Sequence, residues 1–254
     1  MHLADPRFPP LVTGHSVKSP ERPHDVAIAG AMSGTLGAGD LVWSRSSQQV
    51  TGALVLEPDV PLARAREMAL VLQSAVIEAL ALLMPSQTAL QIRWPDHLIC
   101  NGARVGMLRL TAPPVDDDDV PPWMTLGFDI VLQRKLDRVE PGEIESESAI
   151  AEEDGADITR TDLLEAIAPP IIAGIHRWEE DGIRPIVEPW IGRVIGHQSE
   201  AEFEDAGGLQ RTGEVVGIDD DLALIVRTAD GETFLAPYRH VIADAAAAAN
   251  GGGR

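Results

Sequence analysis

The chain has 254 residues, a hydrophobic content of 44% and a formal net charge of −20 at pH 7. This length supports one large core, or one domain followed by a smaller one. The negative charge disfavours binding to nucleic acid and to anionic membrane surfaces, because their phosphates would repel it. The sequence has no run of about 18 apolar residues, so no membrane span is predicted. Cys100 is the only cysteine, which excludes an internal disulfide and is typical of a cytoplasmic protein.

The N-terminal part of the chain alternates short strand patterns with helical ones. Prolines in residues 1–24 predict an extended segment, and residues 25–34 predict a short helix that ends in a glycine-rich stretch. Residues 40–45 and 52–57 are predicted as two strands with a short polar connection between them. Residues 61–84 carry apolar side chains at helical spacing, so we expect a core helix packed on a sheet.

The most informative stretch is residues 91–110. A strand is predicted at residues 89–92, and the Trp94-Pro95 pair interrupts it because proline has no N–H to donate to a sheet. Asn101 and Gly102 predict a type I′ turn, which needs positive φ at both central residues. A second strand is predicted at residues 105–110, so the stretch favours a hairpin with a polar cluster at its end.

In the C-terminal part of the chain, acidic and proline-rich segments separate the predicted strands and helices. Residues 113–122 predict a loop, residues 123–134 a central strand, and residues 139–157 an acidic loop. Residues 161–180 predict a helix that Pro169 and Pro170 either kink or split. A short helix is predicted at residues 183–191, then a polar linker at 192–210, three strands from residue 211 onward and a disordered tail.

Residues 91–110, the central stretch of the chain, resemble a motif of the biotin/lipoate protein ligase family. Its biotin ligases have Lys-Trp-Pro-Asn-Asp-Leu, a turn, and a strand with Lys-x-x-Gly-Ile. The central stretch is similar, with Arg93 and Arg104 at the two lysines and Gly106 at the glycine. The resemblance implies an α+β fold with a mixed β-sheet and packed helices over residues 1–195. It also implies a small SH3-like β-barrel over 196–246, with residues 247–254 as the tail.

The same resemblance implies a set of site residues. Arg93 and Arg104 are expected to stabilise the reacting phosphates as catalytic groups, and Asp129 is expected to hold Mg²⁺. Residues on three different strands and the turn between them are expected to bind the substrate. They are Trp43, Ser44, Arg45, Trp94, Asn101, Gly102, Gly106 and Gly127.

The implied function is activation of a biotin- or lipoate/octanoate-type carboxylic acid with ATP, followed by transfer to a lysine of an acyl-carrier or biotinyl/lipoyl acceptor protein. A homodimer is a candidate assembly, and no nucleic acid or membrane partner is expected. The family's Gly-Arg-Gly-Arg-Arg-Gly loop has no counterpart in the short connection at residues 46–51. Two alternatives therefore stay open. One is a degenerate module that only binds an acyl ligand or a protein, and the other is an ATP-independent acyltransferase with Cys100 as nucleophile.

Overall fold

The computed structural model describes residues 4–134 and 147–243, and its main element is an eight-stranded mixed sheet. Seven strands are hydrogen-bonded in the order β1-β2-β3-β7-β6-β5-β4, and an eighth, β12, pairs with β6. The β1–β2 and β6–β12 pairs are parallel, and the other pairs are antiparallel. The strands are β1 (Thr13–Val17), β2 (Asp40–Ser44), β3 (Gln49–Leu56), β4 (Leu90–Arg93), β5 (His97–Cys100), β6 (Ala103–Ala112), β7 (Met124–Val131) and β12 (Val241–Ile242).

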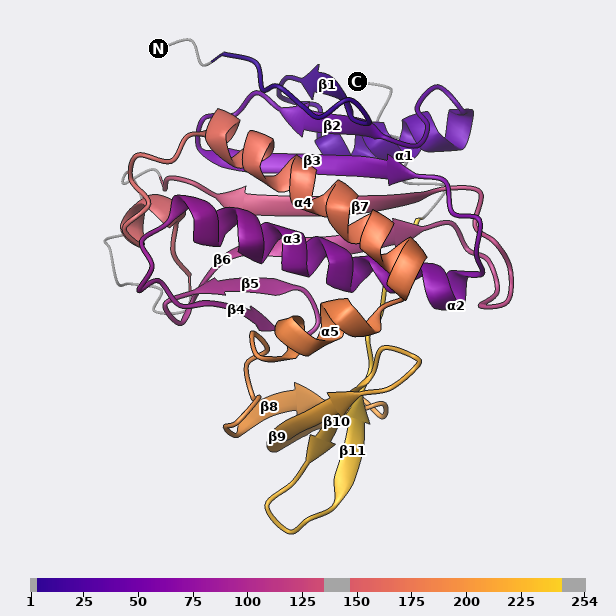
Figure 1. The fold of residues 1–254 in the computed structure, drawn as a ribbon, viewed down its shortest axis with the longest axis vertical. Coiled ribbons are helices and arrows are strands. Elements are labelled where there is room, and N and C mark those ends of the chain that lie inside the picture. The colour runs from indigo at the N-terminus through magenta and orange to yellow at the C-terminus, as the bar shows by residue number, and fades with distance from the viewer. Residues whose placement is uncertain (1–3, 135–146, 244–254) are drawn as a thin grey trace.

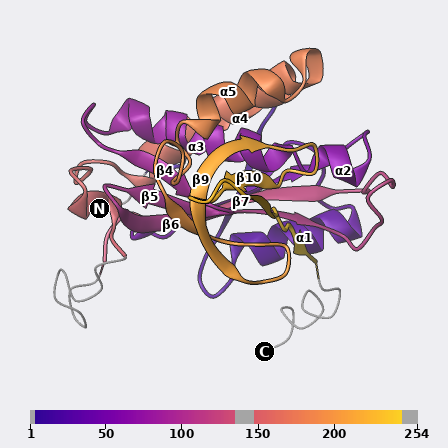
Figure 2. The ribbon, with the colours of Figure 1, turned by 90° about the horizontal axis from the view of Figure 1, so that it is seen from below.

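Helices cover the two faces of this sheet unequally. α3 (Met68–Leu83) and α4 (Arg160–Asp181) lie across one face, with α2 (Leu62–Ala65) before them and α5 (Arg184–Ile191) at the lower end (Figure 1). α1 (Pro23–Ser33) packs on the opposite face, against β2, β3 and β7. Figure 2 shows the sheet between these two helical layers. Within the described chain α1 is the only long helix on its side, and the face of β4, β5 and β6 on that side carries partly exposed polar groups.

The central position of β7 follows from its sequence. Met124, Leu126, Phe128 and Ile130 are buried in the large core beneath α3 and α4. The alternate residues face the α1 side, where Thr125 is also buried. Because both faces of most of β7 are covered, the strand lies in the middle of the seven-strand path, as the apolar run at residues 123–134 predicts.

The central stretch forms three strands where the sequence predicts two. Asn101 and Gly102 have φ of 48° and 92°, which confirms the predicted turn. The Trp94-Pro95-Asp96 segment is itself a tight turn, and β5 follows it and pairs with both β4 and β6. The sequence did not predict β5, because its four residues lie between two turn motifs and are too few to show strand periodicity.

Other boundaries also differ from the sequence-based expectation. β1 pairs with β2 inside the predicted extended segment, and a turn at Arg66 and Glu67 separates α2 from α3. α4 runs without a break through Pro169 and Pro170. Its apolar face packs against α3 and the sheet, and this burial outweighs the hydrogen bonds that the two prolines cannot donate.

The C-terminal part is a separate antiparallel sheet of four strands. They are β8 (Ala201–Glu204), β9 (Gln210–Ile218), β10 (Leu224–Arg227) and β11 (Thr233–Ala236). The order is β11-β10-β9-β8, so the described pairing is open and not a closed barrel, and β8 lies within the predicted linker. The domain boundary at residue 195 stays a prediction. The predicted tail at 247–254 and residues 139–146 of the acidic loop lie outside the described residues. No helix of the described chain has the length and apolarity to cross a membrane.

The turn between β4 and β5 connects the two sheets. Trp94 Nε1 donates to the carbonyl oxygens of Ala236 at 3.0 Å and Pro237 at 3.3 Å. Its ring centroid lies 5.9 Å from that of Trp190 and 5.5 Å from that of Tyr238. Trp94 therefore docks the small sheet onto the main one, because its apolar ring and its polar N–H both find partners at the junction.

We expect Trp94→Phe to loosen this junction. The substitution keeps an aromatic ring but removes the indole donor, and with it both hydrogen bonds to the carbonyls of Ala236 and Pro237, at a cost of about 2 kcal/mol. Urea unfolding would measure the change in free energy. Trp123→Phe is the control, because no side-chain hydrogen bond is recorded for that buried indole within the described chain. Equal stability losses for the two variants would contradict the docking role of the Trp94 N–H.

Candidate functional site

One row of paired residues crosses the main sheet on its α1 side. Arg93 pairs with His97, His97 with Met107, Met107 with Asp129, and Asp129 with Thr51. Directly paired residues of antiparallel strands project their side chains to the same face, about 4.5–5.5 Å apart. The row therefore brings groups from five strands together where the sheet is least covered. Two of the predicted site residues, Arg93 and Asp129, lie on it.

Asp129 is the most heavily bonded member of the row. Its Oδ2 accepts from Arg109 Nη2 at 2.8 Å and contacts His24 Nε2 at 3.0 Å. Arg109 belongs to β6, and His24 lies in the first turn of α1. The helix on this face is thus joined to the sheet by a shared carboxylate. Arg109 is 33% exposed, so it also presents its guanidinium to solvent on this face.

Gly127 makes this arrangement sterically feasible. A Cβ atom built at Gly127 would lie 2.3 Å from His24 Cε1 and 3.1 Å from Arg109 Cγ. Any side chain there would push the imidazole away from Asp129, because such distances are far inside van der Waals contact. The predicted substrate-binding glycine is therefore the position that lets His24 lie over β7.

Opposing effects set the pKa of Asp129. Burial raises it, whereas the hydrogen bond and charge of His24, the charge of Arg109 and a hydrogen bond from Thr51 lower it. The net result is a pKa below the ordinary value of 3.8. Asp129 is therefore ionised at neutral pH, as a carboxylate that accepts two hydrogen bonds from strong donors should be.

A second polar group surrounds His97. Arg104 forms an ion pair with Glu147, and its Nη1 lies 3.4 Å from His97 Nε2. Burial lowers the pKa of His97, Asp96 opposes this effect, and the charges of Arg104 and Arg93 lower it further. The imidazole is consequently neutral at pH 7 and can accept a hydrogen bond from an arginine.

Two separate cavities lie along the row. A cavity of about 260 Å³ lies over β6 and β7 and is lined by Arg104, Arg109 and Asp129. A larger cleft of about 600 Å³ lies between the two sheets and is lined by Arg93, His97 and Arg239. Because His97 and Met107 are paired, the two hollows are about one strand spacing apart on the same face. Each hollow has arginine side chains in its wall.

The structure does not bring Trp43 to this face, although Val42 beside it on β2 packs against α1. Trp43 is 2% exposed in the core under α4, where Arg160 lies over its ring at 5.0 Å. Arg45 pairs with Asp5 at 2.7 Å and donates to Ser16. Ser44 accepts from the backbone N–H of Ser46 in the strand connection. Trp43 packs on the opposite face of the sheet from Asp129, so these two side chains cannot line one pocket.

The residues predicted around the hairpin have mixed positions. Asn101 and Gly102 form the turn at the end of β5 remote from His97, and Asn101 donates to Glu153. Trp94 is engaged in docking, as described above. Gly106 lines the smaller cavity, and a Cβ there would lie 2.5 Å from the backbone oxygen of Asp129. Of the predicted catalytic arginines, Arg104 lines the smaller cavity and Arg93 the larger cleft.

The structure bears on two further expectations about chemistry. Cys100 is fully buried in the core, and burial together with the charges of Glu153 and Asp154 raises its pKa to about 12. A buried thiol with a raised pKa is protonated at neutral pH, which disfavours a role as nucleophile. Asp129 contacts His24 and Arg109 through Oδ2, and its expected role in holding Mg²⁺ stays a prediction. The described residues contain no group of three or more His, Cys, Asp or Glu that could hold a metal ion.

The residues that sequence reasoning missed include Arg109, Glu147 and Arg239, which line these hollows, and His24, which contacts Asp129. Arg109 lies on the predicted strand, but it is five positions after Arg104, so strict alternation would place the two on opposite faces. The irregularity in the pairing of β5 with β6 brings them to the same cavity, and the sequence does not mark it. Nothing local marks His24 or Arg239, because α1 and the segment after β11 reach the site only through tertiary packing.

Comparison with known proteins agrees with this fold. Residues 8–192 match the sequence pattern of the biotin/lipoate A/B protein ligase family. The biotin--[acetyl-CoA-carboxylase] ligase of Paracoccus denitrificans is 25% identical over 193 residues, which cover 76% of this chain and 80% of that protein. The bifunctional ligase/repressor of Bacillus subtilis is 25% identical over 224 residues. That match covers 86% of this chain and 66% of the Bacillus protein, slightly under two thirds of its length.

Solved structures give the same result. A biotin protein ligase-like protein of unknown function from Silicibacter sp. is 34% identical, with a TM-score of 0.79 over 91% of this chain and 96% of that one. The biotin protein ligase of Aquifex aeolicus in complex with biotin and ATP has a TM-score of 0.65. It is 16% identical and covers 89% of this chain and 96% of that one, a level of identity that supports the fold alone.

We expect the ion pairs of Asp129 to give the protein a measurable acid sensitivity. The folded pKa lies below the unfolded one, so this carboxylate stabilises the fold above about pH 4 and loses that effect as pH falls through the folded pKa. Urea unfolding between about pH 3 and 7 should therefore show a steeper acid loss in the natural protein than in Asp129→Asn. Identical acid slopes in the two proteins would show that His24 and Arg109 do not hold Asp129 ionised.

We also expect Cys100 to be unreactive in the folded protein. A thiol-specific disulfide reagent should modify it at least about a hundredfold faster in urea than in buffer, because unfolding removes both its burial and its raised pKa. Absorbance of the released thiolate measures the rate. Fast modification of the natively folded protein would restore Cys100 as a candidate nucleophile.

Proposed function

We propose that this chain, which belongs to the biotin/lipoate A/B protein ligase family, binds a small carboxylic acid on the α1 side of its main sheet. The observation that supports the proposal most directly is the row from Arg93 to Asp129, which joins two arginine-lined hollows. A biotin-, lipoate- or octanoate-type acid has an apolar body and one carboxylate, and both parts find suitable surroundings there.

The smaller cavity suits the acid. Met107 and Val131 supply apolar wall, and Arg109 and Arg104 supply positive charge. Arg109 keeps its guanidinium oriented through Asp129, and a planar guanidinium can bind a carboxylate through two parallel hydrogen bonds. The ionised Asp129 would repel a carboxylate by itself, so its ion pair with Arg109 and its contact with His24 are needed for an acid to bind beside it.

The cleft between the sheets suits the phosphates of ATP. Arg93 and Arg239 line it together with Glu202 and Glu204, and no ion pair within 4.0 Å is recorded for either arginine within the described ranges. Unpaired arginines in a chain with a net charge of −20 are available for an anionic ligand. With the acid in the smaller cavity and ATP in the cleft, the carboxylate of the acid would lie along the row, next to the phosphates of ATP with which it reacts. These positive groups would then offset the charge that develops during adenylation.

A second function is favoured by one specific observation. The connection from β2 to β3 consists of residues 45–48 only, and Arg45 within it already pairs with Asp5. This connection supplies no long basic loop to close over an acyl-adenylate. The rival proposal is therefore a protein that binds the acid without activating it. Transfer to a lysine of an acceptor protein belongs to the first proposal alone.

ATP–pyrophosphate exchange with biotin, lipoate and octanoate distinguishes the two proposals. We expect exchange with one of these acids in the natural protein, and a loss of about a hundredfold in Arg109→Gln, because a charged group that acts on the reacting centre is removed. Calorimetric binding of the same acids, measured in parallel, should weaken in the same variant.

Arg184→Gln is the matched control. Arg184 is an exposed arginine at the start of α5 that lines neither hollow, so its variant removes the same charge without touching the site. Acid binding without exchange would select the binding protein. Absence of both from the folded natural protein, or equal effects of the two substitutions, would overturn the proposed site.

A further inference from the structure

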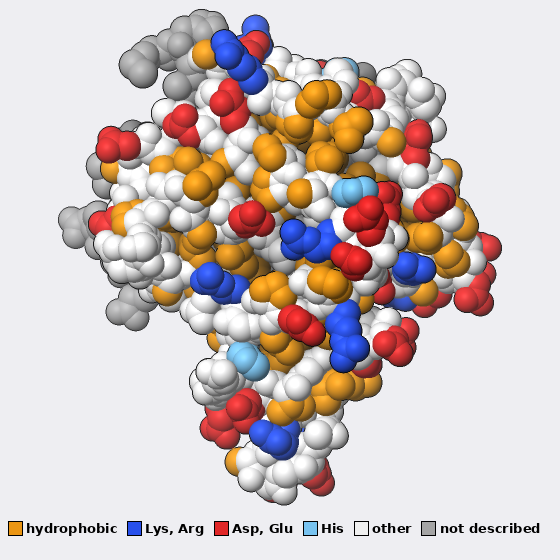
Figure 3. All heavy atoms as spheres, viewed as in Figure 1, with side chains coloured by type: hydrophobic (Ala, Val, Ile, Leu, Met, Phe, Trp, Pro, Cys, Tyr) orange, Lys and Arg blue, Asp and Glu red, His pale blue; other side chains and the backbone are white. Residues whose placement is uncertain are grey.

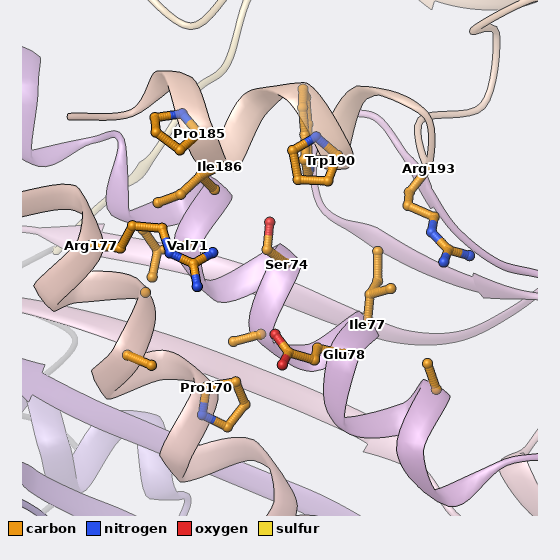
Figure 4. Close-up of a pocket in the computed structure, with 15 residues that line it drawn as sticks. Val71, Ser74, Ile77, Glu78, Pro170, Arg177, Pro185, Ile186, Trp190 and Arg193 are labelled. Carbon is orange, nitrogen blue, oxygen red and sulfur yellow. The ribbon is translucent and has the colours of Figure 1, made fainter. Parts of the chain in front are cut away.

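A third hollow lies in the helical layer, on the other side of the main sheet from Asp129. It has a volume of about 320 Å³ and is enclosed by α3, α4 and α5. Figure 4 shows its wall, with Val71, Ile186 and Trp190 as apolar members. Figure 3 shows the same face of the molecule, where hydrophobic side chains lie among separate basic and acidic groups. None of its lining residues lines the cavities described above.

The hollow contains a buried donor without a partner. Ser74 Oγ is inaccessible to solvent and has no hydrogen-bond partner among the described residues. Its hydroxyl points toward the space between Ile186 and Trp190 (Figure 4). A buried hydroxyl usually finds a partner, because leaving it unpaired costs free energy. A ligand oxygen can reach this hydroxyl only if the Ser74 side chain rotates toward the hollow, and the missing partner in the unliganded protein favours that rotation.

Positive charge exceeds negative charge around the opening. Arg177 of α4 and Arg193, just after α5, line the hollow, and Glu78 is the acidic side chain in its wall. Within the described ranges, neither arginine has a recorded ion pair within 4.0 Å. The two guanidinium groups come from different elements, with Ser74 between them in the view of Figure 4. An apolar body with one anionic head group matches this arrangement.

The wall is preformed. Pro170, Pro185 and Pro189 each contribute a rigid ring, because proline fixes its own φ. Gly174 brings α4 close to α3, since a Cβ there would lie 2.8 Å from Val71 Cγ1. A ligand would consequently bind with little ordering of the protein, which favours affinity.

We propose that this hollow binds an organic monocarboxylate with an aliphatic body, at a site separate from the acid site on the α1 side of the sheet. The aliphatic body packs on Val71, Ile186 and Trp190. The carboxylate accepts a hydrogen bond from Ser74 Oγ and is attracted by Arg177. The proposal does not depend on ATP-dependent activation at the first site.

Calorimetric titration with octanoate tests the proposal in the full-length Arg109→Gln protein, where binding at the first site is weakened. Octanoate should bind, and octan-1-ol and octylamine should bind at least about threefold more weakly, because they lack the charge that Arg177 attracts. Adding Arg177→Gln or Ser74→Ala should each weaken octanoate by at least about threefold. Ala173→Leu, at an exposed position of the rim, should reduce binding by filling the hollow without disturbing the core.

Arg184→Gln again serves as the control, because it removes an arginine of α5 that does not line the hollow. It should leave octanoate affinity unchanged. Circular dichroism verifies that each variant is folded. Failure of octanoate to bind at millimolar concentration, or affinity that Arg177→Gln and Ala173→Leu both leave unchanged, would overturn the proposal. Equal binding of octanoate and octylamine would overturn the carboxylate assignment.

Discussion

Gln73 is the buried polar contact on which the relation between the two sheets depends. It is 1% exposed in the middle of α3, where its amide donates to the carbonyl of Pro95 at 2.8 Å and accepts from the indole of Trp190 at 2.9 Å. The turn after β4, the helix α3 and the helix α5 are thereby fixed to one side chain. The same turn carries Trp94, which bonds the C-terminal sheet. Because a buried amide must be satisfied at both ends, neither α5 nor the turn can shift alone.

This constraint also orients the row on the opposite side. β4 and β5 are joined by the turn that Gln73 holds, and Arg93 and His97 are the residues that flank it. A fixed turn thus fixes where these two groups face the cleft between the sheets. At the other end of the row, Asp129 joins α1 to β6 through His24 and Arg109. The two hollows are therefore supported from opposite ends by different polar contacts.

The arginine content of the site has an electrostatic consequence. The chain has twice as many acidic as basic residues, so an anion that approaches meets an unfavourable overall field. Local arginines can overcome it only where they are concentrated and oriented. Arg104 and Arg109 are held by Glu147 and Asp129, which fixes their geometry and partly neutralises them. Within the described residues Arg93 and Arg239 have no recorded ion pair, although Glu202 and Glu204 lie in the wall of the same cleft.

The sequence by itself determined the elements that local patterns encode. Turn chemistry predicts the turn at Asn101 and Gly102. Apolar periodicity predicts the central strand that carries Asp129 and the helix that ends just before Met84. The motif around Trp94 indicated the family. Only tertiary structure decided what these residues contact. It placed Trp43 under α4 and Trp94 at the junction of the sheets, and it gave Asp129 partners from α1 and β6. Local patterns encode strand and helix formation, whereas contacts between residues about a hundred positions apart, such as His24 and Asp129, depend on how the layers pack.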